Sequence, residues 1–369
     1  MFSSPPPAGI AEAQGVSTIG LPQGGNKTEI SYTHSLADVE PTAWRSLATD
    51  AGHVFATPEW LLTWWRHFGK ERRQLIGLAR TGGKLVAVVP LCESWAHGVR
   101  VLRFVGHGPS DQLGPVSAPL SDPVAASAVR DVIAGIPLKR FILFAERIPG
   151  DQHLTELSSG RLLYREPNPV LQGSWDDFLR ARGRNFRQQV RRFPRKLAEV
   201  GTVSYRLASD PERLDQDLDT LFRLHRQRWE GAATSFLRAA KFHRDFAAQA
   251  FRHGWLRLWF LEIDGAPVAA LLGFRFAGVE AAYQSGRDPA LQQQPAGFVL
   301  LAHAARTALD EGMREYRLGR GGDPYKSRFA TADRTLETHG LARGGAAHVL
   351  LTAAPAQRGR SLGLRRMLA

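Results

Sequence analysis

A short polar loop near the C-terminal end of the sequence groups three side chains that can take part in proton transfer. Asp323, Tyr325 and Lys326 stand in the segment GGDPYKSRF, which covers 321–329. The two glycines free the backbone and the proline favours a turn. A carboxylate here can take a proton from an amine, or orient it, if it lies within about 3 Å of the nitrogen. The lysine can neutralise an anionic substrate group, or it can pair with Asp323 and have only a structural role.

Strand-like runs and one helix-like run come before this loop and must position it. Their apolar residues fit strands of a sheet, and the first two runs meet at the turn Asp264-Gly265. The runs are WLRLWFLEIDG (255–265), APVAALLGFRF (266–276), GVEAAYQSG (278–286), the helix-like FVLLAHAARTALDEGM (298–313) and the short strand REYRLGR (314–320). We therefore expect the polar loop to open from the end of the last strand.

The start of the helix-like run is suited to binding a phosphate group. Pro295-Ala296-Gly297-Phe298 follows a loop, and the free N–H groups in the first turn of a helix attract anions, helped by the helix dipole. The small side chains of Ala296 and Gly297 let a phosphate come close. Arg287, directly after the third strand, can add a contact. An ordinary helix start and a solvated loop arginine are the alternative interpretations.

Positive charge concentrates on a predicted helix in the middle of the chain. Arg184, Arg187, Arg191 and Arg195 are three or four residues apart, so they share one face of a helix expected at about 185–200. The stripe can guide an anionic acceptor such as a nucleotide-sugar, a lipid phosphate or RNA, or it can be a solvated helix between domains. The net charge of +13 at pH 7 suits anionic partners in general and does not choose among them.

The length of 369 residues favours two domains, and 43% hydrophobic residues is ample for globular cores. The single cysteine, Cys92, excludes an intramolecular disulfide and a zinc site built on several thiolates, and its apolar surroundings predict a buried thiol. The sequence shows neither a secretory signal nor a membrane-spanning run, which makes a cytoplasmic protein the default expectation. We expect a disordered tail at 1–28, domains at 29–170 and 171–345, and a basic tail at 346–369.

The order and spacing of several loose motifs resemble those of bacterial acetyltransferases of the GNAT superfamily, in the branch associated with cellulose and exopolysaccharide biosynthesis. The chain is also similar to the Fem-type peptidyltransferases, which carry two GNAT-like domains in tandem. The motifs are TPEWLLTWWRHFG (57–69), GKLVAVVPL (83–91), GHGPSDQLGPV (106–116), RNFRQQVRRFPRKLAEVG (184–201), LFRLHRQRWEG (221–231), FHRDF (242–246) and GRGGDPYKSRF (319–329). The resemblance implies an α/β fold of the α+β type, with two tandem domains, each a mixed, mostly antiparallel sheet flanked by helices.

The resemblance also implies roles for residues of the third strand. Backbone N–H groups around Tyr283, Gln284 and Ser285 are expected to stabilise the oxyanion that forms when an amine attacks a thioester. Tyr283 is expected either to protonate the departing thiolate or to be a half-buried sheet tyrosine.

Three further residues are expected to face the acceptor. Arg228 and Trp229 end a long helix that the superfamily places beside the acceptor cleft, although Trp229 also has the spacing of a core residue. Asp111, in a loop rich in glycine and proline, can reach a cleft between the domains.

The expected activity is transfer of an acyl group from acetyl-CoA or another acyl-CoA to a primary amine by direct attack on the thioester, with no metal. The acceptor would be a small molecule or a saccharide amine, such as an amino sugar or a polysaccharide precursor. The usual pyrophosphate loop of the superfamily has no clean match after AAYQSG, at 281–286. Two alternatives therefore stay open: a Fem-like transferase that uses aminoacyl-tRNA, and a non-catalytic basic binding or scaffold protein of an exopolysaccharide system.

Overall fold

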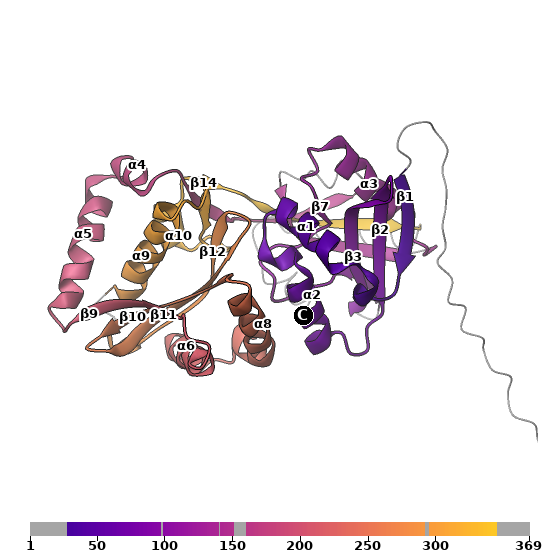
Figure 1. Ribbon diagram of the computed structural model, residues 1–369. Helices are drawn as coiled ribbons and strands as arrows, with labels where there is room; N and C mark the ends of the chain where they lie inside the picture. The colour runs from indigo at the N-terminus through magenta and orange to yellow at the C-terminus, as the bar shows by residue number, and fades with distance from the viewer. Residues whose placement is uncertain (1–27, 97–98, 140, 151–159, 292–294, 345–369) are drawn as a thin grey trace, which may run out of the picture.

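The computed structural model describes residues 28–96, 99–139, 141–150, 160–291 and 295–344, and the tails expected at 1–28 and 346–369 lie outside these ranges, apart from Thr28. The chain builds two sheets, each flanked by helices, as Figure 1 shows. No helix in the described part of the chain is long and apolar enough to cross a membrane. The predicted fold class, two mostly antiparallel mixed sheets with flanking helices, is confirmed.

The first sheet is built mainly from the N-terminal half. In spatial order its strands are β1 (Thr28–Thr33), β2 (Gln74–Thr81), β3 (Lys84–Ala96), β4 (Val99–Phe104), β6 (Phe141–Pro149), β15 (Leu336–Arg343) and β7 (Arg161–Glu166), with β5 (Val116–Ser117) paired to β3. All of these neighbours are antiparallel except β4 and β6. The last strand, β15, comes from the C-terminal end of the described chain and lies among strands of the other half, where Figure 1 draws it in yellow.

The second sheet repeats the same plan. In spatial order its strands are β9 (Val203–Leu207), β10 (Leu256–Ile263), β11 (Ala266–Phe276), β12 (Val279–Arg287), β13 (Glu315–Arg317), β8 (Pro169–Gln172) and β14 (Ala332–Asp333). Its one parallel pair in the described residues is β12 with β13, which matches the parallel pair β4 and β6 of the first sheet. In both sheets a helix connects the parallel pair, as a crossover of this kind requires. The chain therefore contains two copies of one architectural unit, as the sequence suggested.

Helices cover the faces of both sheets. They are α1 (Pro41–Ala51), α2 (Pro58–Phe68), α3 (Pro123–Ala134), α4 (Trp175–Arg180), α5 (Arg184–Ala198), α6 (Leu214–Arg228), α7 (Ser235–Arg238), α8 (Ala240–Arg252), α9 (Ala296–Asp310) and α10 (Pro324–Phe329). The start of α2 follows the capping rules: the side chain of Thr57 accepts a hydrogen bond from the N–H of Trp60, and Pro58 occupies the first helical position.

The two halves share a continuous hydrophobic core. Trp60 of α2 is fully buried, and its ring makes edge contacts with Phe242 and Phe246 of α8 at centroid distances of 4.9 and 4.5 Å. Phe274 of β11 lies 6.2 Å from the same ring. Cys92 is completely buried, as predicted. Because aromatic side chains from both halves interlock here, the two sheets are held in a fixed relation, and a cavity can form at their junction.

Candidate functional site

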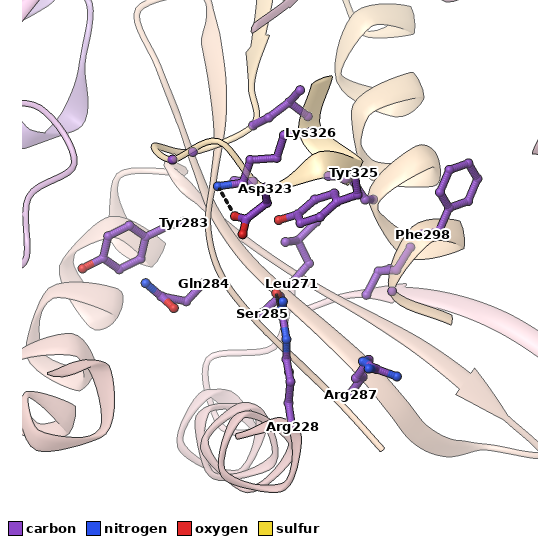
Figure 2. A pocket seen from close by; sticks show the side chains of 18 of the residues that line it. Arg228, Leu271, Tyr283, Gln284, Ser285, Arg287, Phe298, Asp323, Tyr325 and Lys326 are labelled. Carbon is purple, nitrogen blue, oxygen red and sulfur yellow. Dashed lines mark hydrogen bonds and ion pairs between the residues drawn. The ribbon is translucent and has the colours of Figure 1, made fainter. Parts of the chain in front are cut away.

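A cavity of about 810 Å³ lies in the C-terminal half and reaches the junction between the halves. Every site residue nominated from the sequence lines it. These residues are Asp111, Arg228, Trp229, Tyr283, Gln284, Ser285, Arg287, Ala296, Gly297, Phe298, Asp323, Tyr325 and Lys326. Figure 2 labels ten residues of the lining, which come from α6, β11, β12, α9, α10 and the N-cap residue of α10, Asp323. The cavity brings the predicted groups together.

The cavity opens where two parallel strands separate. β12 and β13 pair through only three positions, which end at Ala281 opposite Arg317. The two backbones are still close at the next residues, Ala282 and Gly319, because a Cβ atom built on Gly319 would lie 3.2 Å from the carbonyl oxygen of Ala282. Beyond this apex the end of β12 and the segment leading into α10 line opposite parts of the cavity. The cleft is therefore widest towards Arg287 and narrowest at Gly319.

A bulge interrupts β12 at Tyr283. In the ladder with β11, Gln284 faces Leu272 and Ala282 faces Gly273, so Tyr283 is left without a partner. A bulge of this kind removes one residue from the ladder and increases the local twist. The backbone of Tyr283 itself is therefore not paired with β11, whereas its neighbours Ala282 and Gln284 are, and all three residues line the cavity.

The side chain of Tyr283 is directed to the N-terminal half. Its hydroxyl donates a hydrogen bond to the carbonyl oxygen of Pro109 at 3.0 Å. Burial, reinforced by the nearby carboxylate of Asp111, raises the pKa of this phenol well above its ordinary value. With its proton already engaged by Pro109, the hydroxyl is poorly placed to protonate a leaving group in the cleft.

Helix α6 clamps the cavity side of β12. A Cβ atom built on Gly286 would lie 2.3 Å from the backbone nitrogen of His225, so only glycine allows this approach. Nδ1 of His225 lies 2.9 Å from the carbonyl oxygen of Ser285, and the guanidinium of Arg228 donates to the hydroxyl of the same serine. These contacts fix the strand that follows the bulge against α6.

The N-terminus of α9 faces the wide end of the cleft. Ala296, Gly297 and Phe298 are its first three residues, and the first hydrogen bond of the helix joins Val299 N to Pro295 O. The N–H groups of the three earlier residues therefore have no acceptor within the helix. Arg287 lies beside them, since its Cδ atom would be 3.9 Å from a Cβ atom on Gly297. Among the described residues its guanidinium makes no hydrogen bond or ion pair, so a cation and three N–H donors converge on one place.

The segment predicted as a polar loop, 321–329, forms one wall of the cavity, but Pro324–Phe329 is the short helix α10, which begins at the proline. Nζ of Lys326 lies 3.0 Å from a carboxylate oxygen of Asp323 and donates to the carbonyl oxygen of Arg320 at 2.6 Å. The lysine side chain is 8% exposed, whereas that of Asp323 is 59% exposed. The ion pair between Lys326 and Asp323, one of the predicted alternatives, is thus present. Lys326 stabilises the segment through this pair and its hydrogen bond to Arg320, and Asp323 stays accessible from the cavity.

Sequence reasoning missed an ionic cluster at the junction of the halves. Nε of Arg320 lies 3.0 Å from Asp111, and its Nη1 lies 3.4 Å from both carboxylate oxygens of Glu166. Burial raises the pKa of Asp111, while Arg320 opposes that rise. Arg320 directly precedes the double glycine of the polar segment, and this position could have indicated a site residue. Glu166 lies at the end of β7, and no sequence pattern pointed to it.

Two of the four exposed large hydrophobic residues of the described chain line this cavity. They are Tyr325, 38% exposed, and Trp229, 48% exposed. The core spacing of Trp229 was misleading, because α6 ends at Arg228 and Trp229, its C-cap residue, has non-helical backbone angles (φ −103°, ψ 25°). Burial raises the pKa of the Tyr325 phenol, and Arg228 nearby opposes the rise.

Residues 184–327 match the family model described as the acetyltransferase (GNAT) domain. This range contains the cleft between β12 and β13, the bulge, the N-terminus of α9 and the polar loop. No protein in the comparison with curated sequences matches the chain.

The comparison with solved structures extends the likeness to both halves. FemX superimposes with a TM-score of 0.60 at 11% identity, covering 88% of this chain and all of FemX. The C-terminal domain of a putative lysylphosphatidylglycerol synthetase from Agrobacterium fabrum gives 0.52 at 10% identity, covering 86% and 96%. A conserved protein of unknown function from Bacteroides thetaiotaomicron gives 0.53 at 12%, covering 85% and 99%. At such identities the likeness shows the shared two-sheet fold.

Proposed function

We propose that this protein is an N-acyltransferase that moves an acyl group from coenzyme A to a primary amine, for which an amino sugar or a polysaccharide precursor is a candidate. The observation that most supports this proposal is the cleft between β12 and β13. It has a strand bulge in one wall and, at its wide end, a helix N-terminus without a side-chain cap. The match to the acetyltransferase (GNAT) family model over the same residues supports the proposal.

The wide end of the cleft would hold the phosphates of the donor. The N–H groups of Ala296, Gly297 and Phe298 and the guanidinium of Arg287 supply donors and positive charge there. The small Gly297 is exposed, so a phosphate can reach the backbone. This cradle replaces the glycine-rich sequence pattern that is absent after the third strand.

The bulge would hold the thioester. Backbone N–H groups around Tyr283, Gln284 and Ser285 would stabilise the oxyanion as the amine nitrogen attacks the carbonyl carbon. Asp323, accessible from the cavity, would accept the proton of the amine. The carbon–sulfur bond then breaks, and the thiolate would take a proton from Tyr325, whose raised pKa keeps that phenol protonated at neutral pH.

Isothermal titration with acetyl-CoA tests this proposal. We expect micromolar binding to the full chain, weakened about tenfold by Arg287→Ala because one cation leaves the phosphate cradle. Arg306→Ala is the matched control, since Arg306 lies on the exposed side of α9 and pairs only with Asp310 there. Absence of acetyl-CoA binding, or equal loss in both variants, would refute the proposed donor site.

One observation favours a second candidate, the transferase that takes its acyl group from aminoacyl-tRNA. Helix α5 packs on α9 through Phe186 and Phe193, which contact the ring of Phe298. Its basic side chains Arg184, Arg191, Arg192, Arg195 and Lys196 are exposed and form no ion pair among the described residues. Salt-sensitive tRNA binding without acetyl-CoA binding would favour this candidate. Binding of neither would favour the scaffold protein.

A further inference from the structure

The direction in which a donor would lie in the cleft follows from its two ends. The phosphate cradle is at Arg287 and α9, and the bulge is at Tyr283, four residues earlier on β12. Four residues of strand span roughly 13 Å. A carrier that is anchored at Arg287 and has its thioester at the bulge must point its acyl group onward, to the apex at Ala282 and Gly319.

The apex is occupied by charged side chains. A Cβ atom built on Gly319 would lie 3.9 Å from Oδ2 of Asp111 and 4.0 Å from Nζ of Lys326. Asp111 in turn binds Arg320, which also contacts Glu166. An acyl chain that extends past the bulge therefore meets charged side chains next to the apolar residues Ala282 and Leu318. Other apolar residues of the cavity, such as Leu271 and Leu300, lie on β11 and α9.

Asp111 is held rigidly by the N-terminal half. Its loop, 107–111, accepts hydrogen bonds from the indole nitrogens of two buried tryptophans, Trp64 to His107 O at 3.0 Å and Trp60 to the Ser110 hydroxyl at 2.8 Å. The half-buried Arg147 donates to the carbonyl oxygens of Gly108 and Ser110 in the same loop. These contacts leave the carboxylate of Asp111 little freedom to withdraw from the apex.

A long hydrocarbon chain at this apex would be costly. It would remove remaining water from the cluster of Asp111, Arg320 and Glu166 and offer no hydrogen bond in return. A small acyl group ends before the cluster and leaves its hydration and pairing intact.

We propose that the N-terminal half determines acyl-chain specificity: Asp111, together with Arg320 and Lys326, closes the acyl end of the cleft, so that the site accepts a short acyl group and rejects a long hydrocarbon one. This inference rests on the proposed use of a coenzyme A thioester. It assigns a selective function to a half of the chain that lies outside the matched GNAT range, 184–327.

The test compares coenzyme A, acetyl-CoA and octanoyl-CoA by titration calorimetry on the full chain. We expect acetyl-CoA to bind at least about tenfold more tightly than octanoyl-CoA. Equal or tighter binding of octanoyl-CoA, with coenzyme A itself bound, would overturn the specificity while leaving the proposed function intact. Failure of all three ligands to bind would refute the proposed function and the specificity with it.

Variants locate the selectivity at Asp111. Asp111→Ala opens the apex, and we expect the preference for acetyl-CoA over octanoyl-CoA to fall several-fold, whereas Asp50→Ala, an exposed control in the same half, keeps it. Asp111→Asn removes the charge at constant size. If the alanine variant fails to fold, we expect the asparagine variant to show the same fall in the preference for acetyl-CoA. An unchanged preference in the folded Asp111 variants would contradict the assignment.

Discussion

The hydroxyl of Tyr283 donates to the carbonyl oxygen of Pro109 at 3.0 Å, and this hydrogen bond joins the bulge of β12 to a loop of the other half. A tyrosine expected to act as an acid is thus turned away from the cleft. The phenol of Tyr325, on the opposite wall and partly exposed, is the better proton donor for a thiolate. The relationship favours Tyr325, rather than the Tyr283 proposed from the sequence, as the proton donor.

The two tyrosines should respond differently to loss of the hydroxyl. Tyr325→Phe should lower kcat about a hundredfold or more, the usual contribution of a positioned acid. Tyr283→Phe should change kcat by less than tenfold and cost about 1 kcal/mol of unfolding free energy, because one hydrogen bond is lost. The measurement is thiol release from acetyl-CoA with glucosamine as the trial amine, beside urea unfolding. A larger kcat effect at Tyr283 would restore its catalytic role.

Gly297→Ala should separate stability from binding at the N-terminus of α9. The new methyl group has free space, with only Arg287 Cδ at 3.9 Å, and alanine favours the helix by up to ~1 kcal/mol. The same methyl group blocks the approach of a phosphate to the backbone. We expect a higher midpoint in urea and a severalfold weaker affinity for acetyl-CoA. Unchanged affinity in the stabilised variant would place the phosphates elsewhere.

Gly286→Ala should damage fold and site together. Its Cβ atom would lie 2.3 Å from His225 N and 2.5 Å from Leu224 C, backbone atoms of α6 that cannot move aside easily. We expect ~1–3 kcal/mol of destabilisation, as in other overpacked positions. Because β12 must shift, acetyl-CoA affinity should fall as well. Gly183→Ala, where the added Cβ atom meets nothing within 4 Å, is the matched control for added volume. A stable Gly286→Ala protein would show that α6 can move to make room for the methyl group.

Stability should fall in mild acid because of a buried histidine. Burial lowers the pKa of His243 from 6.5 to about 3, so between these values the unfolded chain binds more protons than the folded one. Its contribution is complete above about pH 6.5 and is lost as the pH falls, by up to ~1.4 kcal/mol per pH unit. Urea unfolding at pH 7 and 5.5 should show a smaller difference in His243→Gln than in the wild type. His253→Gln, which is more exposed, should keep the wild-type difference.

Much of the fold was predictable because it depends on residues close in sequence. The apolar runs at 255–286 match β10, β11 and β12, since side-chain alternation and turn residues act over a few positions. The placement of the polar loop after β13 followed in the same way.

Features that depend on contacts between distant segments could not be predicted. Asp111 and Arg320 are 209 residues apart, and no local pattern indicates that they form an ion pair. The bulge at Tyr283 depends on the register with β11, which sequence does not display. Trp229 lines the cavity, one of its two predicted positions, and the spacing that suggested a core residue could not show that α6 ends at Arg228. The chemical roles of the residues that line the cavity stay predictions.

Strand β15 has a consequence for the order in which the protein can be made. Residues 336–343 pair with β6 on one side and β7 on the other, so in the described chain they are what attaches β7 to the first sheet. On a ribosome the N-terminal half emerges first and yet lacks an inner strand until nearly all of the described chain has been synthesised. The exposed edge of β6 must stay unpaired throughout that interval. The emergence of residues 336–343 is therefore the event that completes the N-terminal sheet.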